Sequence, residues 1–151
     1  MNKALLQQLI LDQLRGDLAQ AQQAALTAYE AATHEENIAE NKYDTLGLEA
    51  SYLAAGQARR VEEIRQALSA WEKLRLRPFD AQLGIQLSAL VWLADAEGAG
   101  AGLKLLLDGQ QVRVISPRAP LGQRLIGCGE GDQVELRMGS SIQRFEVLRV
   151  C

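Results

Sequence analysis

The acidic side chains of this sequence gather in one short stretch near residue 40. Between Glu30 and Glu49, six acidic residues accompany a single basic residue, Lys42, and few apolar residues interrupt residues 33–48. Carboxylates are hard oxygen ligands of the kind that Mg²⁺ accepts, and Mg²⁺ usually takes only one or two of them from a protein. The stretch therefore has two interpretations: a solvated bend that favours helix, or a carboxylate pair that completes a metal site in another protein.

Other chemistries find little support in the residues. Two cysteines, Cys128 and Cys151, and one histidine, His34, are too few for a four-ligand zinc site. The glycine-rich run at residues 98–102 lacks the lysine of a phosphate-binding loop. With 16 basic and 19 acidic residues and a net charge of −3, the chain has no basic footprint for nucleic acid. No apolar run reaches the roughly 18 residues that span a bilayer, so we expect a soluble, cytoplasmic protein with free thiols.

Composition divides the chain near Arg77 and Pro78. All three prolines and ten of the thirteen glycines follow residue 77, whereas the preceding residues are rich in Ala, Gln, Leu, Glu and Arg, which favour helices. A chain of 151 residues suffices for one domain or for two small ones. We therefore predict a helical domain over residues 1–77 and a globular α+β domain over residues 78–151.

Two heptad seams run through the helical part. The first comprises Leu11, Leu14, Leu18, Ala21, Ala25, Ala28 and Ala32, and the second comprises Ala50, Ala54, Gln57, Val61, Ile64, Leu68 and Trp71. Spacings that alternate between three and four residues predict helices that pack along one stripe. Because a polar break separates the seams, they predict an antiparallel two-helix coiled coil with its tip at residues 33–48. Alanine predominates near the bend, so this arm, about 45–50 Å long, should be slender there.

The second part predicts short antiparallel strands and one helix. The segments that predict strands are Ile85–Ala94, Leu103–Leu107, Gln111–Ile115, Asp132–Met138 and Arg144–Val150, with a turn at residues 139–141. Asp108 and Gly109 supply the positive φ angles of a type I′ turn. A short helix is predicted over Leu121–Ile126, with Pro120 in its first turn and Gly127 after its end. The pattern is α+β in class: a small antiparallel sheet with one helix against it.

Two segments carry a resemblance to a known family. Residues 119–127 are Ala-Pro-Leu-Gly-Gln-Arg-Leu-Ile-Gly, and residues 131–136 are Gly-Asp-Gln-Val-Glu-Leu. They are similar to the Ser-Pro-Leu-Gly-x-x-Leu-x-Gly and Gly-Asp-x-Val pattern of the Gre-type (GreA/GreB-like) bacterial transcription elongation factors. At the bend, Glu-Asn-Lys-Tyr at residues 40–43 is similar to the family's Glu-Asn-x-x-Tyr, one residue shorter. The resemblance covers nearly the whole chain and preserves the domain order.

The resemblance implies a fold and a partner. Gre factors join a coiled-coil arm to an FKBP-like globular domain, which docks on RNA polymerase at the rim of its secondary channel while the arm enters the channel. Acidic residues at the tip help to hold a Mg²⁺ ion and a water, and the polymerase cleaves its own backtracked transcript by two-metal hydrolysis. The chain would then modulate the polymerase rather than be an enzyme by itself. We expect a monomer that binds neither membranes nor specific nucleic-acid sequences.

The resemblance also implies roles for individual residues. Glu36 and Glu40 would contact Mg²⁺, held jointly with the polymerase, and the chain would carry no cofactor of its own. Acidic support would come from Glu35 and Asp44, while Asn37, Asn41 and Tyr43 would shape the tip. The segment that would touch the polymerase rim, here named the docking loop, comprises Ser116, Pro117, Arg118, Ala119, Pro120, Leu121 and Gly122.

Departures from the family pattern leave alternatives open. Asn37 stands where the family has an aspartate three residues before the glutamate, and an amide is a weaker metal ligand than a carboxylate. Arg118 and Ala119 stand where the family tends to have Asp or Asn and then Ser. One alternative is therefore a secondary-channel binder without cleavage activity that regulates initiation, as proteins resembling the DksA class do. Another is a coiled-coil interaction or self-association module, which the extra leucines at residues 5–10 favour.

Overall fold

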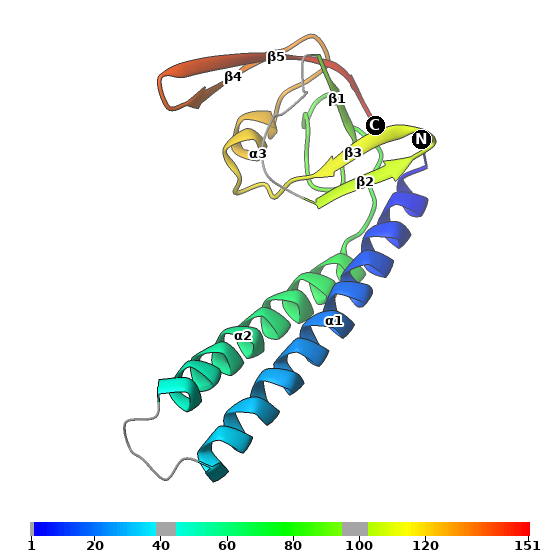
Figure 1. Ribbon diagram of the computed structural model, residues 1–151. Helices are drawn as coiled ribbons and strands as arrows, with labels where there is room; N and C mark the ends of the chain where they lie inside the picture. The colour runs from blue at the N-terminus through cyan, green and yellow to red at the C-terminus, as the bar shows by residue number, and fades with distance from the viewer. Residues whose placement is uncertain (1, 39–44, 95–102) are drawn as a thin grey trace. The chain divides into compact units, whose positions relative to one another are not determined.

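The computed structural model divides the chain into two compact units and describes residues 2–38, 45–94 and 103–151. The elements are, in chain order, α1 (Lys3–Ile38), α2 (Thr45–Lys73), β1 (Val91–Leu93), β2 (Leu103–Leu107), β3 (Gln110–Val114), α3 (Pro120–Leu125), β4 (Gln133–Met138) and β5 (Ser141–Val150) (Figure 1). The first unit, the helical arm, is Gln7–Leu74. The second, the globular unit, comprises Arg75–Cys151 together with the residues up to Leu6. None of the described helices is long and apolar enough to cross a membrane.

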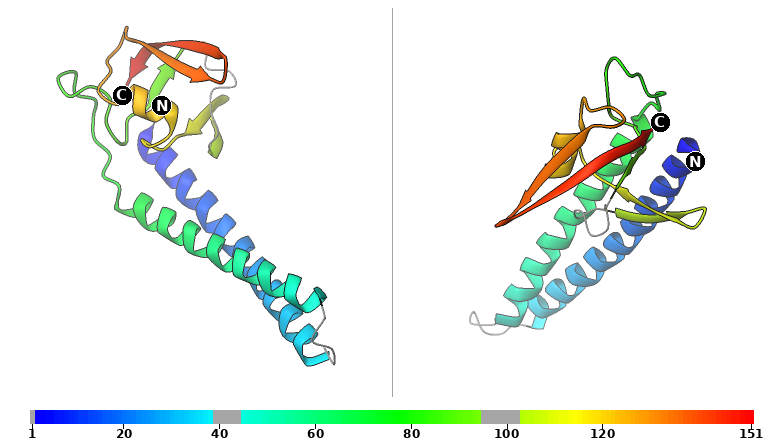
Figure 2. Two further views of the ribbon diagram at one scale, coloured as in Figure 1. Left: turned by 90° about the vertical axis from the view of Figure 1, so that its left-hand side faces the viewer. Right: turned by 90° about the horizontal axis from the view of Figure 1, so that it is seen from above.

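In the helical arm, α1 and α2 lie side by side and run antiparallel (Figures 1 and 2). Every described member of the two predicted seams is buried or half-buried, which confirms the heptad prediction. Ala21, Val61 and Ile64 form a buried cluster, and Leu14, Leu18 and Ala25 pack against it. Towards the bend, Ala28 and Ala32 are only 5% and 7% exposed. Because so small a side chain is buried only where the facing helix comes close, the arm is narrow there.

Side-chain amides hold the base of the arm in register. Gln7 is the first residue of α1 that belongs to the arm. Its Nε2 donates hydrogen bonds of 3.0 Å to the carbonyl oxygens of Trp71 and Leu74. These carbonyls lie at the end of α2, where the i+4 N–H partners of a continuing helix are missing; the Trp71 oxygen also accepts from the Leu74 N–H at 3.4 Å. The nearby ion pair between Arg15 and Glu72, at 3.7 Å, is half exposed and contributes little.

Two exposed glycines weaken the arm. A Cβ atom added at Gly16 in α1 or at Gly56 in α2 would meet nothing within 4 Å. Glycine in a helix interior costs roughly 0.5–1 kcal/mol relative to alanine, because the unfolded chain loses more conformational freedom. We expect Gly16→Ala and Gly56→Ala each to raise the free energy of unfolding of the arm by about that amount, measured by urea titration with far-UV circular dichroism. A loss of stability in either variant would contradict this prediction.

The globular unit contains two small antiparallel sheets and one helix, rather than the single sheet expected. One sheet has the order β1-β5-β4 and the other is the β2-β3 hairpin. The buried core of the globular unit comprises Ile85, Leu121, Leu125, Val134, Leu136, Phe145, Val147 and Val150. The predicted type I′ turn is confirmed, with φ of 52° at Asp108 and 75° at Gly109. Helix α3 spans Pro120–Leu125, one residue earlier than predicted.

The predicted strand over Ile85–Ala94 is wrong for most of its length, since only Val91–Leu93 is a strand. Before it, Ser88 has a positive φ of 71°, and its hydroxyl accepts a hydrogen bond from the Arg77 N–H at 3.0 Å. A left-handed residue interrupts extended backbone. The apolar run is nevertheless partly core, because Ile85 is only 4% exposed.

The end of β5 departs from strict alternation. Val147 and Val150 are buried, although three residues apart, while Leu148 is 55% exposed. Where β5 pairs with β1, the register shifts between Trp92 and Leu93. Such a bulge changes which side chains face the core, so Val150 faces the core and Leu148 does not. The turn before β5 is also shorter than predicted, because Met138 already pairs with Ser141.

Candidate docking surface

The predicted tip residues fall outside the part of the chain that the structure describes in atomic detail. Glu40, Asn41, Tyr43 and Asp44 lie between α1 and α2, outside the described residues. Glu35, Glu36 and Asn37 belong to the end of α1, but their side chains are not among those described. Over residues 2–38, 45–94 and 103–151, no group of three or more His, Cys, Asp and Glu side chains could hold a metal ion. The metal roles of Glu36 and Glu40 therefore remain predictions from the sequence.

The docking loop, by contrast, is held by a set of local hydrogen bonds. The Ser116 carbonyl oxygen accepts a bond of 3.0 Å from the Ala119 N–H, which closes a β-turn with Pro117 at its second position. The Ser116 hydroxyl accepts a second bond, 3.1 Å, from the Arg118 N–H. The Gln123 side-chain amide donates to the Arg118 carbonyl oxygen at 3.0 Å. The loop backbone is therefore fixed relative to α3.

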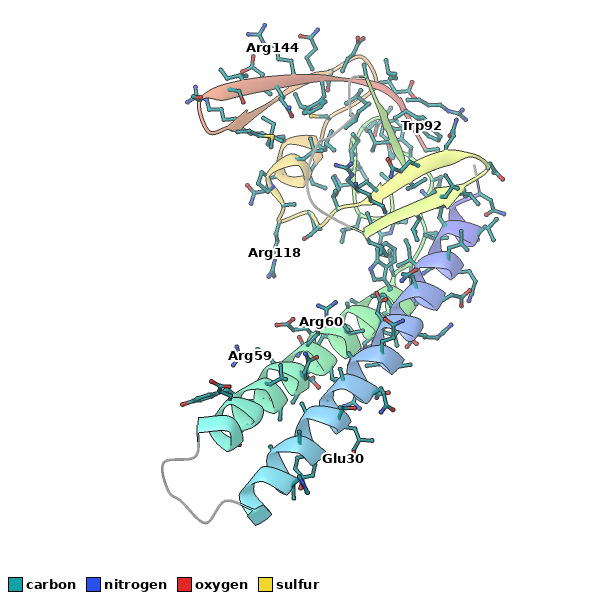
Figure 3. All side chains as sticks on the ribbon, viewed as in Figure 1. Glu30, Arg59, Arg60, Trp92, Arg118 and Arg144 are labelled. Atoms are coloured by element: carbon teal, nitrogen blue, oxygen red, sulfur yellow. The ribbon has the colours of Figure 1, made fainter. Side chains whose placement is uncertain are left out.

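Helix α3 anchors the loop to the core and divides the predicted docking residues into two groups. Leu121 and Gly122 are buried, and Leu121 belongs to the core cluster together with Leu125. Ser116, Pro117, Arg118 and Pro120 are exposed, and Ala119 is half-buried. Figure 3 shows the Arg118 side chain pointing away from the ribbon. Only the second group can contact another protein, while the first positions it.

The second segment of the sequence resemblance, residues 131–136, and the turn before it, residues 127–130, have a structural explanation as well. Gly127 and Gly131 have positive φ angles of 83° and 88°, which glycine adopts without strain. The Asp132 carboxylate accepts a bond of 2.8 Å from the Gly129 N–H. The Asp132 carbonyl oxygen accepts a hydrogen bond of 2.8 Å from the N–H of Val147 in β5. This segment therefore shapes the turn that leads into β4.

The structure adds exposed residues that the sequence analysis did not single out. Arg124 lies in the last turn of α3, Ile126 follows it with 41% exposure, and Leu83 is 61% exposed. A signal for the arginines was present, since residues 109–129 contain Arg113, Arg118 and Arg124 but no acidic residue. For the two apolar residues there was none, because an exposed and a buried aliphatic residue look alike in a sequence.

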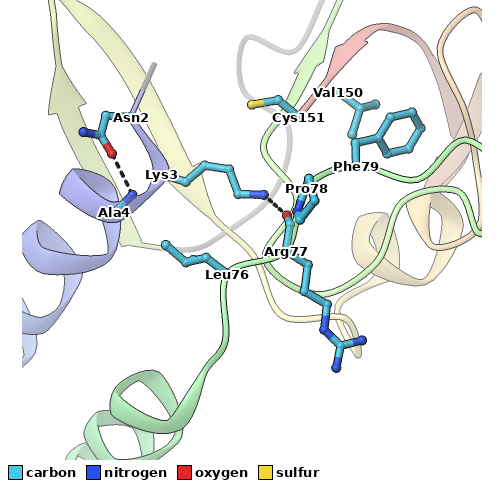
Figure 4. A pocket seen from close by; sticks show the side chains of 9 residues that line it. All are labelled: Asn2, Lys3, Ala4, Leu76, Arg77, Pro78, Phe79, Val150 and Cys151. Atoms are coloured by element: carbon cyan, nitrogen blue, oxygen red, sulfur yellow. Dashed lines mark hydrogen bonds between the residues drawn. The ribbon is translucent and has the colours of Figure 1, made fainter.

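A cavity of about 610 Å³ lies elsewhere in the globular unit (Figure 4). Its lining residues are Asn2, Lys3, Ala4, Leu76, Arg77, Pro78, Phe79, Val150 and Cys151. The Lys3 ammonium already donates to the Arg77 carbonyl oxygen, and the Asn2 carboxamide caps α1 by accepting from the Ala4 N–H at 2.9 Å. The Lys3 and Asn2 side chains therefore serve the local fold.

The two thiols are free, as expected. Burial, and secondarily the negative charge of Asp132, raise the pKa of the Cys128 thiol above its usual value. Its sulfur also donates a weak hydrogen bond to the Arg124 carbonyl oxygen at 3.2 Å. Because the thiolate is the nucleophilic form, a raised pKa makes Cys128 a poor nucleophile at neutral pH.

Comparison with known proteins gives matches among solved structures alone. No protein-family model matches the chain, and no curated protein matches it. GreA factor homolog 1 (Gfh1) of Thermus thermophilus is 18% identical, covering 93% of this chain and 94% of that chain with a TM-score of 0.39. Gfh1 of Thermus aquaticus is 22% identical, covering 92% of each chain with a TM-score of 0.36. A structure of the transcription factor Gfh1 is 20% identical, covering 93% and 92% with a TM-score of 0.36.

Proposed function

We propose that the chain is an accessory factor of RNA polymerase that docks through its globular unit and inserts its helical arm into the secondary channel. The observation that carries this proposal is the arm, two antiparallel helices whose buried seam ends in alanines beside the acidic stretch of the sequence. Resemblance of residues 119–127 and 131–136 to the Gre pattern supports the same function. On this view any chemistry belongs to the polymerase.

The dimensions of the arm suit a probe. The part of helix α1 that belongs to the arm runs from Gln7 to Ile38, which at about 1.5 Å per residue extends over roughly 48 Å. Two packed helices measure only about 20 Å across with their side chains, and small seam residues such as Ala28 and Ala32 reduce that width towards the bend. Such an arm can carry a few carboxylates deep into a narrow opening.

The tip would contribute oxygen ligands to metal ions in the active site of the polymerase. Metal ions of the polymerase stabilise the attacking and leaving oxygens during phosphodiester hydrolysis. The carboxylates of Glu36 and Glu40 fit the preference of Mg²⁺ for oxygen donors and for few protein ligands. Glu35 and Asp44 would keep the local potential negative, and Asn41 and Tyr43 would shape the bend. We propose that this chain assists cleavage in backtracked complexes in this way.

One observation favours a second candidate function. Asn37 occupies the position of an acidic residue in the family pattern, and a neutral amide binds Mg²⁺ less well than a carboxylate does. A chain with one tip carboxylate fewer would occupy the channel without stimulating cleavage and would regulate initiation instead. Both candidates share the same docking, so they differ in cleavage and not in polymerase binding.

The burial of side chains at the start of α1 supports self-association less than the sequence pattern alone does. The leucine-rich start of α1 suggested it, yet Leu6 and Ile10 are buried within the chain, at 6% and 5% exposure. Leu9 is half-buried, and only Leu5 remains 45% exposed. Most of the apolar surface that favoured a second copy is therefore already covered. A dimeric mass in light scattering at micromolar concentration would favour self-association.

Competition for purified polymerase tests the proposed function. We expect the full chain, labelled with a fluorophore, to bind core RNA polymerase and to be displaced by an unlabelled Gre factor, because both would occupy the same channel. A Glu36→Gln, Glu40→Gln double variant serves as the control, since its docking should be unchanged. Failure of the wild-type chain to bind the polymerase would contradict the proposal.

A further inference from the structure

The surface around α3 combines unpaired positive charge with exposed apolar side chains. Arg118 precedes the helix and Arg124 lies within its last turn; both are exposed. Neither guanidinium forms an ion pair within the described residues, where the salt bridges involve Arg15 and Arg144. Ile126 and Leu83 are 41% and 61% exposed. We name these four residues, Leu83, Arg118, Arg124 and Ile126, the α3 surface.

The backbone segments that carry the four residues are adjacent within the globular unit. The backbones of Gly84 and Gly127 touch, because a Cβ atom at Gly84 would lie 2.3 Å from the Gly127 carbonyl oxygen. Two hydrogen bonds strengthen this contact: Gly127 N–H to the Ile85 oxygen at 2.9 Å, and Ile85 N–H to the Cys128 oxygen at 2.8 Å. Leu83 and Ile126 each directly precede the contact. Helix α3 spans only six residues, about 9 Å, so Arg118 is close by.

The backbone that presents these side chains is preorganised. Leu83 sits in a turn closed by a bond of 2.9 Å from the Gly84 N–H to the Asp80 oxygen. The Asp80 carboxylate also accepts from the Gln82 N–H at 2.8 Å. The docking loop that carries Arg118 is fixed by its own hydrogen bonds to Ser116 and Gln123. A surface that is already ordered loses little conformational freedom on binding.

The charge of this surface indicates the chemistry of its partner. Within the described residues, the guanidinium groups of Arg118 and Arg124 form no ion pair, whereas the carboxylates on the neighbouring segments accept hydrogen bonds from backbone N–H groups: Asp80 from Gln82, Glu130 from Val150 and Asp132 from Gly129. The charge that this surface leaves free for a partner is therefore positive. Arginine is enriched at protein–protein interfaces, whose buried centre is more apolar than the rest of the surface. Where the Gre pattern has Asp or Asn, this chain has Arg118, so a basic side chain replaces an acidic or neutral one at this position.

We propose that the α3 surface is the docking interface and that it binds a patch of the polymerase that presents carboxylates around an apolar centre. This proposal rests on the proposed function and adds the chemical character of the contact. Arg118 and Arg124 form the charged rim, which accelerates encounter and selects an acidic partner. Leu83 and Ile126 form the apolar centre, whose burial supplies affinity that salt does not screen.

A substitution series at Arg118 tests the sign of the charge. We expect binding of the full chain to core RNA polymerase to be close to wild type for Arg118→Lys, weaker for Arg118→Ala, and about tenfold weaker for Arg118→Asp. The loss for Arg118→Asp should shrink between 50 and 200 mM salt, because screening reduces repulsion. The exposed Arg137 on β4 offers a matched control, and Arg137→Asp should bind as wild type does. Tighter binding of Arg118→Asp than of wild type would overturn the proposal.

The apolar centre has a separate test. We expect Leu83→Ser and Ile126→Ser each to weaken binding by about five- to tenfold, equally at low and high salt. Leu148→Ser, at a leucine that is 55% exposed on β5, is the control and should have no effect. If the wild-type chain binds and the variants at Arg118, Leu83 and Ile126 bind as tightly as it does, the proposed role of the α3 surface is wrong while the proposed function stands. If wild type does not bind, both are wrong.

Discussion

Replacing Glu40 by glutamine is expected to lower transcript cleavage in stalled, backtracked complexes by about 10- to 100-fold, the usual cost of removing a group that supports a metal site. Glutamine keeps the size of the side chain but removes its charge, and a neutral amide is a weaker ligand of Mg²⁺. Docking should be unchanged, because the docking loop and the α3 surface lie in the other unit of the chain. Cleavage and polymerase binding are measured on the same complexes.

A matched control is available within the acidic stretch. Glu30 is exposed on α1, eight residues before the helix ends at Ile38 (Figure 3), and Glu30→Gln removes the same charge at a distance from the tip. We expect this variant to cleave as wild type does. Equal cleavage by wild type and Glu40→Gln would contradict a metal role for the tip carboxylate, and equal loss in both variants would indicate a general charge effect.

The complementary substitution separates the two candidate functions. Asn37→Asp restores the carboxylate of the family pattern, and we expect it to raise cleavage because the tip then offers one more oxygen ligand of the right charge. If wild type cleaves and Asn37→Asp cleaves faster, the chain is a weakened cleavage factor. If wild type binds without cleaving, regulation without cleavage is the better description.

The helical arm could be predicted because its sequence pattern is the physical requirement itself. A side chain at every third or fourth position must meet the facing helix, so residues as different as Trp71 and Ala32 are covered in the structure for the same reason. The β2-β3 hairpin was similarly local, since Asp108 and Gly109 determine their own backbone angles. In both elements the residues that determine the structure can be recognised from their spacing or type along the chain.

Prediction failed where distant residues determine the local conformation. The apolar run from Ile85 predicts a strand by composition, yet Gly84 turns with a φ of 73° to meet Gly127, and Ser88 turns again with a φ of 71°. Whether Leu148 or Val150 faces the core depends on a register shift in the pairing of β5 with β1, which lies far away in sequence. Because Trp92 pairs with Arg149 and Leu93 with Val147, Leu148 is the extra residue of a bulge in β5, and alternation along β5 alone does not reveal it.

The candidate docking surface was predicted in part. Sequence resemblance selected residues 116–122, but the structure assigns Leu121 and Gly122 to the interior and leaves Arg118 outside. Leu83 could not have been included, because it joins this surface only through the contact between Gly84 and Gly127. Motif matching therefore selects the residues that shape the loop more readily than the exposed residues beside it.

The second large effect is expected from Gly122→Ala, which should destabilise the globular unit by about 2–3 kcal/mol. A Cβ atom at this position would lie 2.1 Å from the Ser116 carbonyl oxygen, 3.0 Å from its carbon and 3.1 Å from the Pro117 Cα. All three are backbone atoms, so no side-chain rotation relieves the overlap. Either the docking loop moves away or α3 leaves the core, where Leu121 and Leu125 are nearly fully buried.

Urea unfolding in a Trp71→Phe background measures this effect, because Trp92 then reports on the globular unit alone. Gly129→Ala is the control, since its Cβ would have only the Asp132 carboxylate nearby, at 4.0 Å, and we expect a change within about 0.5 kcal/mol. Unchanged stability of Gly122→Ala would mean that the loop yields without cost. In that case Arg118 would lose its fixed position, and polymerase binding should fall even though the fold does not.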